Sequence, residues 1–337
     1  MRRREFLFGS AAAVAAPSLR AEGTGGVRFL AFADIHFNPG WAPHSTVDWL
    51  DRVLSRAVRT QCDFVIHAGD LVHNPPNPAD AAYIRHYNGF GRLPTYHCLG
   101  NHDTQECTLE ETLSAFGLKR SYYHFDRGGF RFVVLDTNWW GIGDETVHYS
   151  KQADATVPRK NRRAYAMPKE ELAWFRETIG DSPHPCVVIS HSSLERERSW
   201  SPEARAAVEA IDAANAAHPG RVILAINGHN HVDYLRVRNR VAYLDLNGAN
   251  YAMWSPKTHA AYTAEDAKEF RFADRILAYR DPLSAVVTLT PGGGIEVEGL
   301  KSAWYRDVTP ERAGLPACDG ADREWSPEIS GFKLKLS

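Results

Sequence analysis

The sequence predicts an α/β fold, and three observations carry that prediction. From Val27 to Asp103, apolar runs alternate with segments of helical spacing. This strand–helix–strand order is typical of parallel strands joined by helices that cover the sheet. Further along the chain, apolar runs repeatedly end in a polar residue that could bind a metal. The chain has no internal repeat and no low-complexity linker, so we expect one domain, at residues 27–305.

The first half begins with a mostly apolar run at residues 27–32, which we expect to form a buried strand. Ser45 is followed three residues later by Asp48, a pattern typical of a helix start. Residues 64–66 and 95–99 predict the next two strands.

The second half predicts a hairpin at residues 122–136, with its turn at Gly128 and Gly129. Pro168 and Pro202 indicate the starts of two helices. Further strands are expected at residues 185–190, 222–226, 241–246, 285–290 and 295–299.

The two ends of the chain differ from the rest. Residues 1–21 combine Arg3 and Arg4 with a short apolar run, which resembles a twin-arginine export signal. The run is too short to span a bilayer, so we expect no transmembrane span in the mature chain. We expect export to the periplasm or the exterior, with the Tat machinery as partner of the precursor; the alternative is a basic tail or a retained anchor. Residues 306–337 predict a tail that packs on the domain or is poorly ordered.

The composition is that of an ordinary globular protein, with 44% hydrophobic and 24% charged residues. A formal net charge of -2 provides no global basic field, and we find no nucleic-acid-binding signature. The five cysteines include no C-x-x-C pair, which argues against a dense disulfide framework. A disulfide between Cys98 and Cys107 remains a hypothesis for an exported protein.

The polar residues that follow five of the predicted strands form a candidate metal centre. Strand ends of such sheets meet at one rim, and residues two apart on an extended segment face the same side. Imidazole, carboxylate and amide ligands without a thiolate suit two divalent ions, chosen from Mn, Fe, Zn, Co or Ni. Asp70 could bridge them through its two oxygens. The seven candidate ligands are Asp34, His36, Asp70, Asn101, His191, His229 and His231.

These residues lie in five short blocks whose order resembles that of the calcineurin-like metallophosphoesterases. The blocks are Asp34-x-His36, Gly69-Asp70, Gly100-Asn101-His102-Asp103, His191 and Gly228-His229-x-His231. The resemblance implies a four-layer sandwich, in which two mixed β-sheets pack face to face with helices outside.

The resemblance also implies how the residues act. Asp34, His36, Asp70 and His231 would hold one ion, and Asp70, Asn101, His191 and His229 the other. A hydroxide activated by the two ions would attack phosphorus in line. His102 would not be a ligand but would protonate the leaving oxygen or stabilise the transition state. Asp103 would orient His102.

His73 stands three residues after Asp70, where purple acid phosphatases of the same superfamily place a tyrosine ligand. It argues against that branch, and the motifs resemble the cyclic-nucleotide phosphodiesterase-like branch more closely. We therefore expect a small-molecule phosphate ester substrate, with a phosphodiester slightly favoured. The alternatives are a phosphomonoesterase and an inactive scaffold or binding protein, although the latter is expected to lack ligands.

Aromatic residues after two strands are candidates for substrate contact. Trp139, Trp140, Tyr251 and Trp254 could stack on a base or line a lipid or sugar pocket, or could simply pack within loops. The basic residues 159–163 could contact phosphate or form a solvated loop.

Overall fold

The computed structural model describes residues 25–43, 46–73, 78–150, 162–196, 201–254, 262–315 and 325–336. The predicted export signal lies outside these residues. Within them, no helix combines the length and apolar character needed to cross a membrane.

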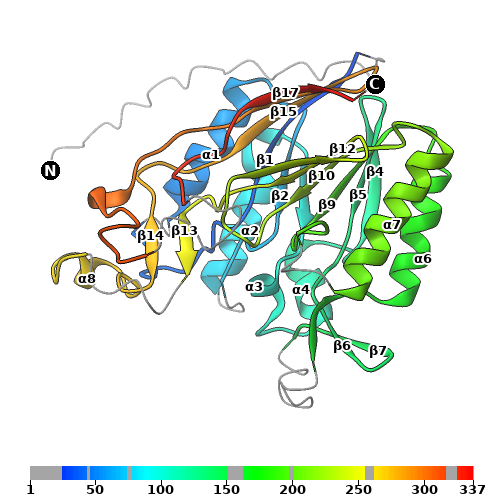
Figure 1. Cartoon of the computed structure of the whole chain (residues 1–337). Coiled ribbons are helices and arrows are strands. Elements are labelled where there is room, and N and C mark those ends of the chain that lie inside the picture. Colours follow the sequence, from blue (N-terminus) through cyan, green and yellow to red (C-terminus); the bar gives the residue numbers. More distant parts are fainter. Residues whose placement is uncertain are drawn as a thin grey trace, which may run out of the picture.

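Two six-stranded sheets form the body of the protein (Figure 1). The first sheet has the order β17 (Phe332–Lys335), β16 (Gly294–Glu298), β15 (Ala285–Thr290), β1 (Val27–Phe32), β2 (Phe64–Ala68) and β3 (Thr95–Cys98). The second has the order β11 (Tyr234–Arg238), β12 (Val241–Asp245), β10 (Val222–Asn227), β9 (Cys186–Ser190), β5 (Phe130–Val134) and β4 (Tyr123–Arg127). Both sheets are mixed. In the first, β1, β2 and β3 are parallel and β15 joins β1 antiparallel. In the second, β12, β10, β9 and β5 are parallel, and the edge strands β11 and β4 are antiparallel to their neighbours.

The two sheets pack face to face through a shared apolar core. Phe29 and Phe64 of the first sheet contact Phe132 of the second, with ring centroids 5.3 and 5.1 Å apart and the rings nearly perpendicular. Edge-to-face contacts of this kind contribute about 0.5–1.5 kcal/mol each beyond the buried area. All three side chains are fully buried, so this layer holds the sheets in register.

Helices cover the outer face of each sheet. α1 (Val47–Arg59) and α2 (Pro78–Gly89) pack on the first sheet, and α6 (Lys169–Gly180) and α7 (Pro202–Ala217) on the second (Figure 1). The predicted four-layer fold is therefore confirmed. The N-cap of α1 is Thr46, whose hydroxyl accepts from the amide of Trp49, so the start predicted from Ser45 was one residue early.

Smaller elements surround one end of the sandwich. β6 (Trp139–Ile142), β7 (Glu145–His148) and β8 (Arg163–Ala166) form a three-stranded sheet that the sequence did not predict, called the rim sheet below. Figure 1 shows β6 and β7 at the same end as α3 (Asn101–Thr104). The remaining elements are α3 (Asn101–Thr104), α4 (Leu109–Phe116), α8 (Asp266–Glu269), the 3-10 helices Phe90–Arg92 and Tyr305–Asp307, and the paired strands β13 (Tyr251–Trp254) and β14 (Ile276–Ala278).

The described C-terminal segment, residues 325–336, packs on the domain. Close to the C-terminus, β17 pairs with β16 as the edge strand of the first sheet, and the amide of Ser330 donates to Asp233 at 2.9 Å.

Cys98 and Cys107 are free thiols, so the disulfide hypothesis is wrong. Cys98 is instead fully buried at the end of β3, where its thiol donates to the carbonyl of Leu135.

Candidate metal centre

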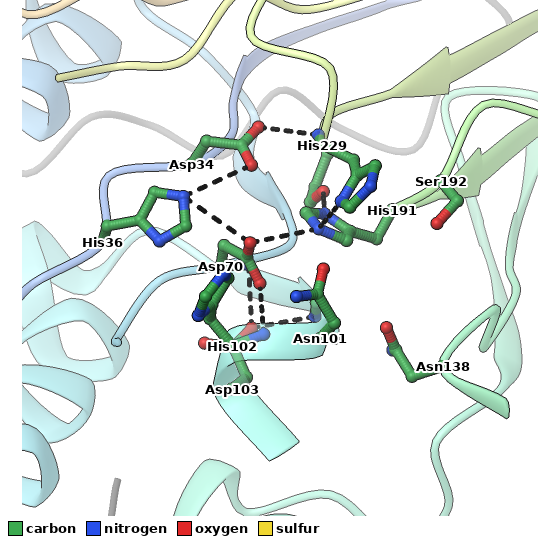
Figure 2. A network of polar contacts seen from close by, with 12 residues as sticks. Asp34, His36, Asp70, Asn101, His102, Asp103, Asn138, His191, Ser192 and His229 are labelled. Atoms are coloured by element: carbon green, nitrogen blue, oxygen red, sulfur yellow. Dashed lines mark hydrogen bonds and ion pairs between the residues drawn. The ribbon is translucent and has the colours of Figure 1, made fainter. Parts of the chain in front are cut away.

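All seven predicted ligands lie at one end of the two sheets. Asp34, Asp70 and Asn101 follow the neighbouring parallel strands β1, β2 and β3. His191 and His229 follow the neighbouring parallel strands β9 and β10 of the other sheet. Figure 2 shows their side chains converging between the loops. The rim inferred from the strand ends is thus the arrangement the fold produces.

The backbone at the ligands is not extended, contrary to the expectation from their spacing. Asp34, His36, Asp70, His229 and His231 have φ values of 54°, 46°, 58°, 67° and 50°. Each such residue in the left-handed region costs about 1–3 kcal/mol, and such residues persist where the surrounding structure holds them. The chain therefore turns sharply at these five of the seven ligands, and the turns bring their side chains toward one another.

Glycines before two ligands permit this close approach. A Cβ at Gly100 would lie 2.1 Å from Oδ1 of Asp70. At Gly69, where φ is +102°, a Cβ would lie 2.0 Å from Nδ1 of His191. Either contact would push a ligand loop away, which explains the glycine in each block.

Three groups of side chains have ligand atoms within 4.8 Å of one another and could hold a metal ion. One joins His36 to His73 and His102, and the other two consist of predicted ligands only. In the first of these two, Nε2 of His231 lies 3.4 Å from Oδ1 of Asp34 and 3.2 Å from Nε2 of His36. In the second, Nε2 of His191 lies 3.2 Å from Oδ2 of Asp70 and 3.2 Å from Nδ1 of His229.

Asp70 connects the two groups through one oxygen. Its Oδ2 lies 3.6 Å from Nε2 of His36 and 3.2 Å from Nε2 of His191 (Figure 2). Its Oδ1 accepts the backbone amide of His102 at 2.8 Å. We expected both oxygens to bridge; the structure instead presents a single oxygen to both groups and holds the other with an amide.

Hydrogen bonds on the outer nitrogens set the direction of the imidazoles. Nδ1 of His191 donates to the carbonyl of Ala68 at 2.9 Å, and Nδ1 of His231 to that of Tyr251 at 2.7 Å. A neutral imidazole that donates from Nδ1 presents the lone pair of Nε2, and here both Nε2 atoms face inward. His229 is reversed, because its Nδ1 faces inward and its Nε2 contacts another residue, described below.

The donor set fits divalent cations. Oδ1 of Asp34 and Oδ1 of Asn101 are buried without a hydrogen-bond partner. Burial and the neighbouring His191 lower the pKa of His229 to about 3, so this ring is neutral. Burial lowers the pKa of His191, but the Asp70 carboxylate more than reverses this and raises it to about 10. The buried Asp70 therefore faces positive charge, which divalent ions at neutral imidazoles would supply.

We had expected Asp103 to orient His102, but its hydrogen bonds go elsewhere. Its carboxylate accepts the backbone amides of Asp70, Val72 and Gly100 at 2.9, 3.0 and 2.9 Å. Burial and the charge of Asp70 raise the pKa of Asp103 to about 8, whereas the amides of Val72 and Gly100 favour its ionised form. Asp103 thus ties the loop after β2 to the loop after β3 and acts on the backbone.

His102 is positioned by His73, which sequence reasoning had used only to exclude a branch of the family. The two rings stack with centroids 3.9 Å apart at 22°. Nδ1 of His73 lies 2.9 Å from Nδ1 of His36, so the same ring also contacts a predicted ligand. Its position three residues after Asp70 was the available signal, but the spacing did not specify this contact.

The aromatic candidates for substrate contact occupy different environments. Tyr251 is 2% exposed and stacks on His36 and His231, so it packs behind ligands. Trp139 donates to Asp136 at 3.2 Å, and Trp140 packs on Tyr149; both are half-buried in the rim sheet. Trp254 ends β13, and its side chain lies outside the described part of the structure, as do basic residues 159–161.

Tyr165 is a site residue that sequence reasoning missed. It lies in β8, has a φ of 58°, and places its hydroxyl 2.7 Å from Nε2 of His229. No motif surrounds it in the sequence, because the contact arises only when the rim sheet folds over the end of β10.

Comparisons with known proteins identify a family by sequence and similar folds among solved structures. Residues 27–233 match the family described as Calcineurin-like phosphoesterase. No curated protein sequence matches significantly. The fold is similar to that of a dimetal phosphatase from Danio rerio, with a TM-score of 0.59 and 13% identity over 93% of this chain and 100% of that one. GAP50, the anchor in the inner membrane complex of Plasmodium, has a TM-score of 0.49 and 13% identity over 93% of this chain and 90% of that one.

Proposed function

This chain belongs to the calcineurin-like phosphoesterase family and is a phosphoesterase; we propose that it hydrolyses small-molecule phosphodiesters at a centre of two divalent ions. The observation that carries the proposal is Oδ2 of Asp70, which faces ligand atoms of both groups. One negatively charged oxygen between two cation sites offsets the repulsion between ions about 4 Å apart.

Each residue of the site has a proposed role. Asp34, His36 and His231 would hold one ion with Asp70, and His191, His229 and Asn101 the other with Asp70. When bound, the ions would supply Lewis acidity to the phosphoryl group and lower the pKa of water. His102 is held next to Asp70 by the hydrogen bond that its backbone N–H donates to Oδ1 of Asp70, and by the stacking of its ring on His73. Because its Nδ1 is buried, proton transfer to the leaving oxygen would use Nε2.

The diester preference is supported by the Gly100-Asn101-His102-Asp103 block and by the retained His36. It is tested by loading purified protein with Mn, Fe, Zn, Co or Ni and comparing bis-p-nitrophenyl phosphate with p-nitrophenyl phosphate. We expect a higher kcat/KM for the diester. A strong monoester preference would replace the proposal with a phosphomonoesterase. Protein that carries two equivalents of metal but is inert on every ester would indicate an inactive binding protein.

We also propose that the enzyme is exported through the twin-arginine pathway, on the evidence of Arg3 and Arg4. Replacing both by lysine should leave the enzyme inside the cell, and unchanged export of that variant would reject the pathway.

A further inference from the structure

Burial of the site residues indicates the side from which substrate arrives. Asp34, His36, Asp70 and His191 are buried, with at most 3% of their surface exposed. The other four site residues are partly exposed and form what we call the mouth of the site: Asn101, His102, His229 and His231. Among these eight residues, the mouth is therefore the side of the centre that a phosphoryl group can reach.

Tyr165 lies against one residue of this mouth. Its hydroxyl is 2.7 Å from Nε2 of His229, and the two rings meet edge to face with centroids 4.9 Å apart. The carbonyl of Tyr165 accepts the hydroxyl of Ser201 at 2.7 Å, which anchors β8 to the start of α7. Its φ of 58° is rare for a residue with an aromatic side chain and indicates that the position of the ring is enforced.

The protonation of His229 determines the direction of this hydrogen bond. Nδ1 of His229 faces Nε2 of His191 at 3.2 Å, within the second ligand group. A neutral imidazole that offers the Nδ1 lone pair to a cation carries its hydrogen on Nε2. The oxygen of Tyr165 must then accept from Nε2, which leaves the phenolic hydrogen without an acceptor at His229.

We propose that Tyr165 donates this hydrogen to a non-bridging oxygen of the phosphoryl group, as a substrate-contacting residue at the mouth. The inference rests on the proposed function and deepens it. An anionic phosphoryl oxygen is a strong acceptor for a phenolic O–H group. Tyr165 would thus hold the substrate and, through the same oxygen, keep the tautomer of His229.

The test compares Tyr165→Phe with Tyr122→Phe, a control that removes the hydroxyl of a ring packed on Trp174 and Arg120. Metal content is measured by elemental analysis, and the affinity for inorganic phosphate by calorimetry on metal-loaded protein. We expect Tyr165→Phe to keep its metal when metal is in excess and to bind phosphate about 10-fold more weakly or worse. Its kcat/KM should fall by a similar factor, and Tyr122→Phe should behave as the parent.

The inference is overturned if metal-replete Tyr165→Phe binds phosphate as the parent protein does. If excess metal alone restores phosphate affinity and turnover, Tyr165 only supports His229, and the substrate contact is again rejected. The phosphate measurement needs no turnover. A parent protein inert on all esters would therefore defeat the proposed function and leave the comparison of phosphate affinities intact.

Discussion

Two clusters of buried Asp and His residues lie close to the same end of the sandwich, and their hydrogen bonding separates them. The first is the metal centre. The second, called the Asp136 network below, joins the loop after β5 to the rim sheet and to α6. In it Oδ1 of Asp136 accepts the amide and the side-chain nitrogen of Asn138 at 3.0 and 2.9 Å, and Oδ2 accepts Nε1 of Trp139. His148 lies 3.3 Å from Oδ2 of Asp136, and Glu171 accepts the amide of Asp136 at 2.7 Å.

The difference lies in which groups carry hydrogens. In the Asp136 network, N–H groups point at both oxygens of Asp136, and none of its five residues has a positive φ. In the metal centre, ring nitrogens face ring nitrogens at 3.2 Å, and Oδ1 of Asp34 and Oδ1 of Asn101 have no hydrogen-bond partner. The Asp136 network also contains atoms without a hydrogen-bond partner, Oε2 of Glu171 and both ring nitrogens of His148, but its five residues include no pair of facing imidazoles. Residue composition alone therefore does not identify a metal site. The strained backbone, together with imidazole nitrogens that face one another beside buried carboxylates, is the feature that distinguishes the metal centre, and bound cations would satisfy this arrangement.

The largest expected effect comes from exchanging one carboxylate for an amide in each cluster. Asp70→Asn should lose one or both ions and reduce turnover to background, because its Oδ2 faces both groups. Asp136→Asn should keep its metal and activity while losing about 1–3 kcal/mol of stability, since its donors lose a charged acceptor. Elemental analysis, activity assays and urea unfolding of both variants make the comparison. Metal loss in Asp136→Asn alone would reverse the roles assigned to the clusters.

The next largest effect distinguishes His102 from His148, neither of which is a proposed ligand. His102→Ala should retain metal and lower kcat by roughly 10²–10⁴-fold, as expected for loss of a general acid. The matched change His148→Ala should leave kcat per folded molecule unchanged and lower the stability, because His148 faces only the Asp136 network. Steady-state kinetics and metal analysis are done on both proteins. Metal loss in His102→Ala would contradict its role as a non-ligand.

The ligands were predictable because each follows an apolar strand, and parallel strands of a sheet end at a common rim. Features that depend on contacts between distant segments could not be predicted from the sequence. Tyr165 reaches His229 from a sheet with no sequence pattern of its own, and the carboxylate of Asp103 binds three amides instead of the neighbouring His102. The spacing of Asp34 and His36 suggested extended backbone, whereas packing holds both in the left-handed region. Spacing specifies which residues share an edge, but the directions of side chains come from the folded loops.

The smallest effect concerns the charge of Glu171 in the Asp136 network. Burial and the neighbouring Asp136 raise the pKa of Glu171 well above its usual value. The pKa of Asp136 is lowered instead: burial alone would raise it, but the neighbouring His148 outweighs the effect of burial. The network is therefore built around one neutral and one ionised carboxyl group.

The folded protein holds the Glu171 proton more tightly than the unfolded chain, so its stabilisation is complete below the unfolded pKa of about 4.3. It declines as pH rises from that value toward the raised folded pKa. Glu171→Gln keeps the acceptor for the amide of Asp136 but cannot ionise. The variant and parent should match near pH 4.5, and the variant should gain about 1 kcal/mol or more by neutral pH. Urea unfolding of both proteins between pH 4.5 and pH 8 measures this difference, and metal content should not change. Parallel stability curves would mean that Glu171 is not the protonated member, and the Asp136 network would then need a cation as the metal centre does.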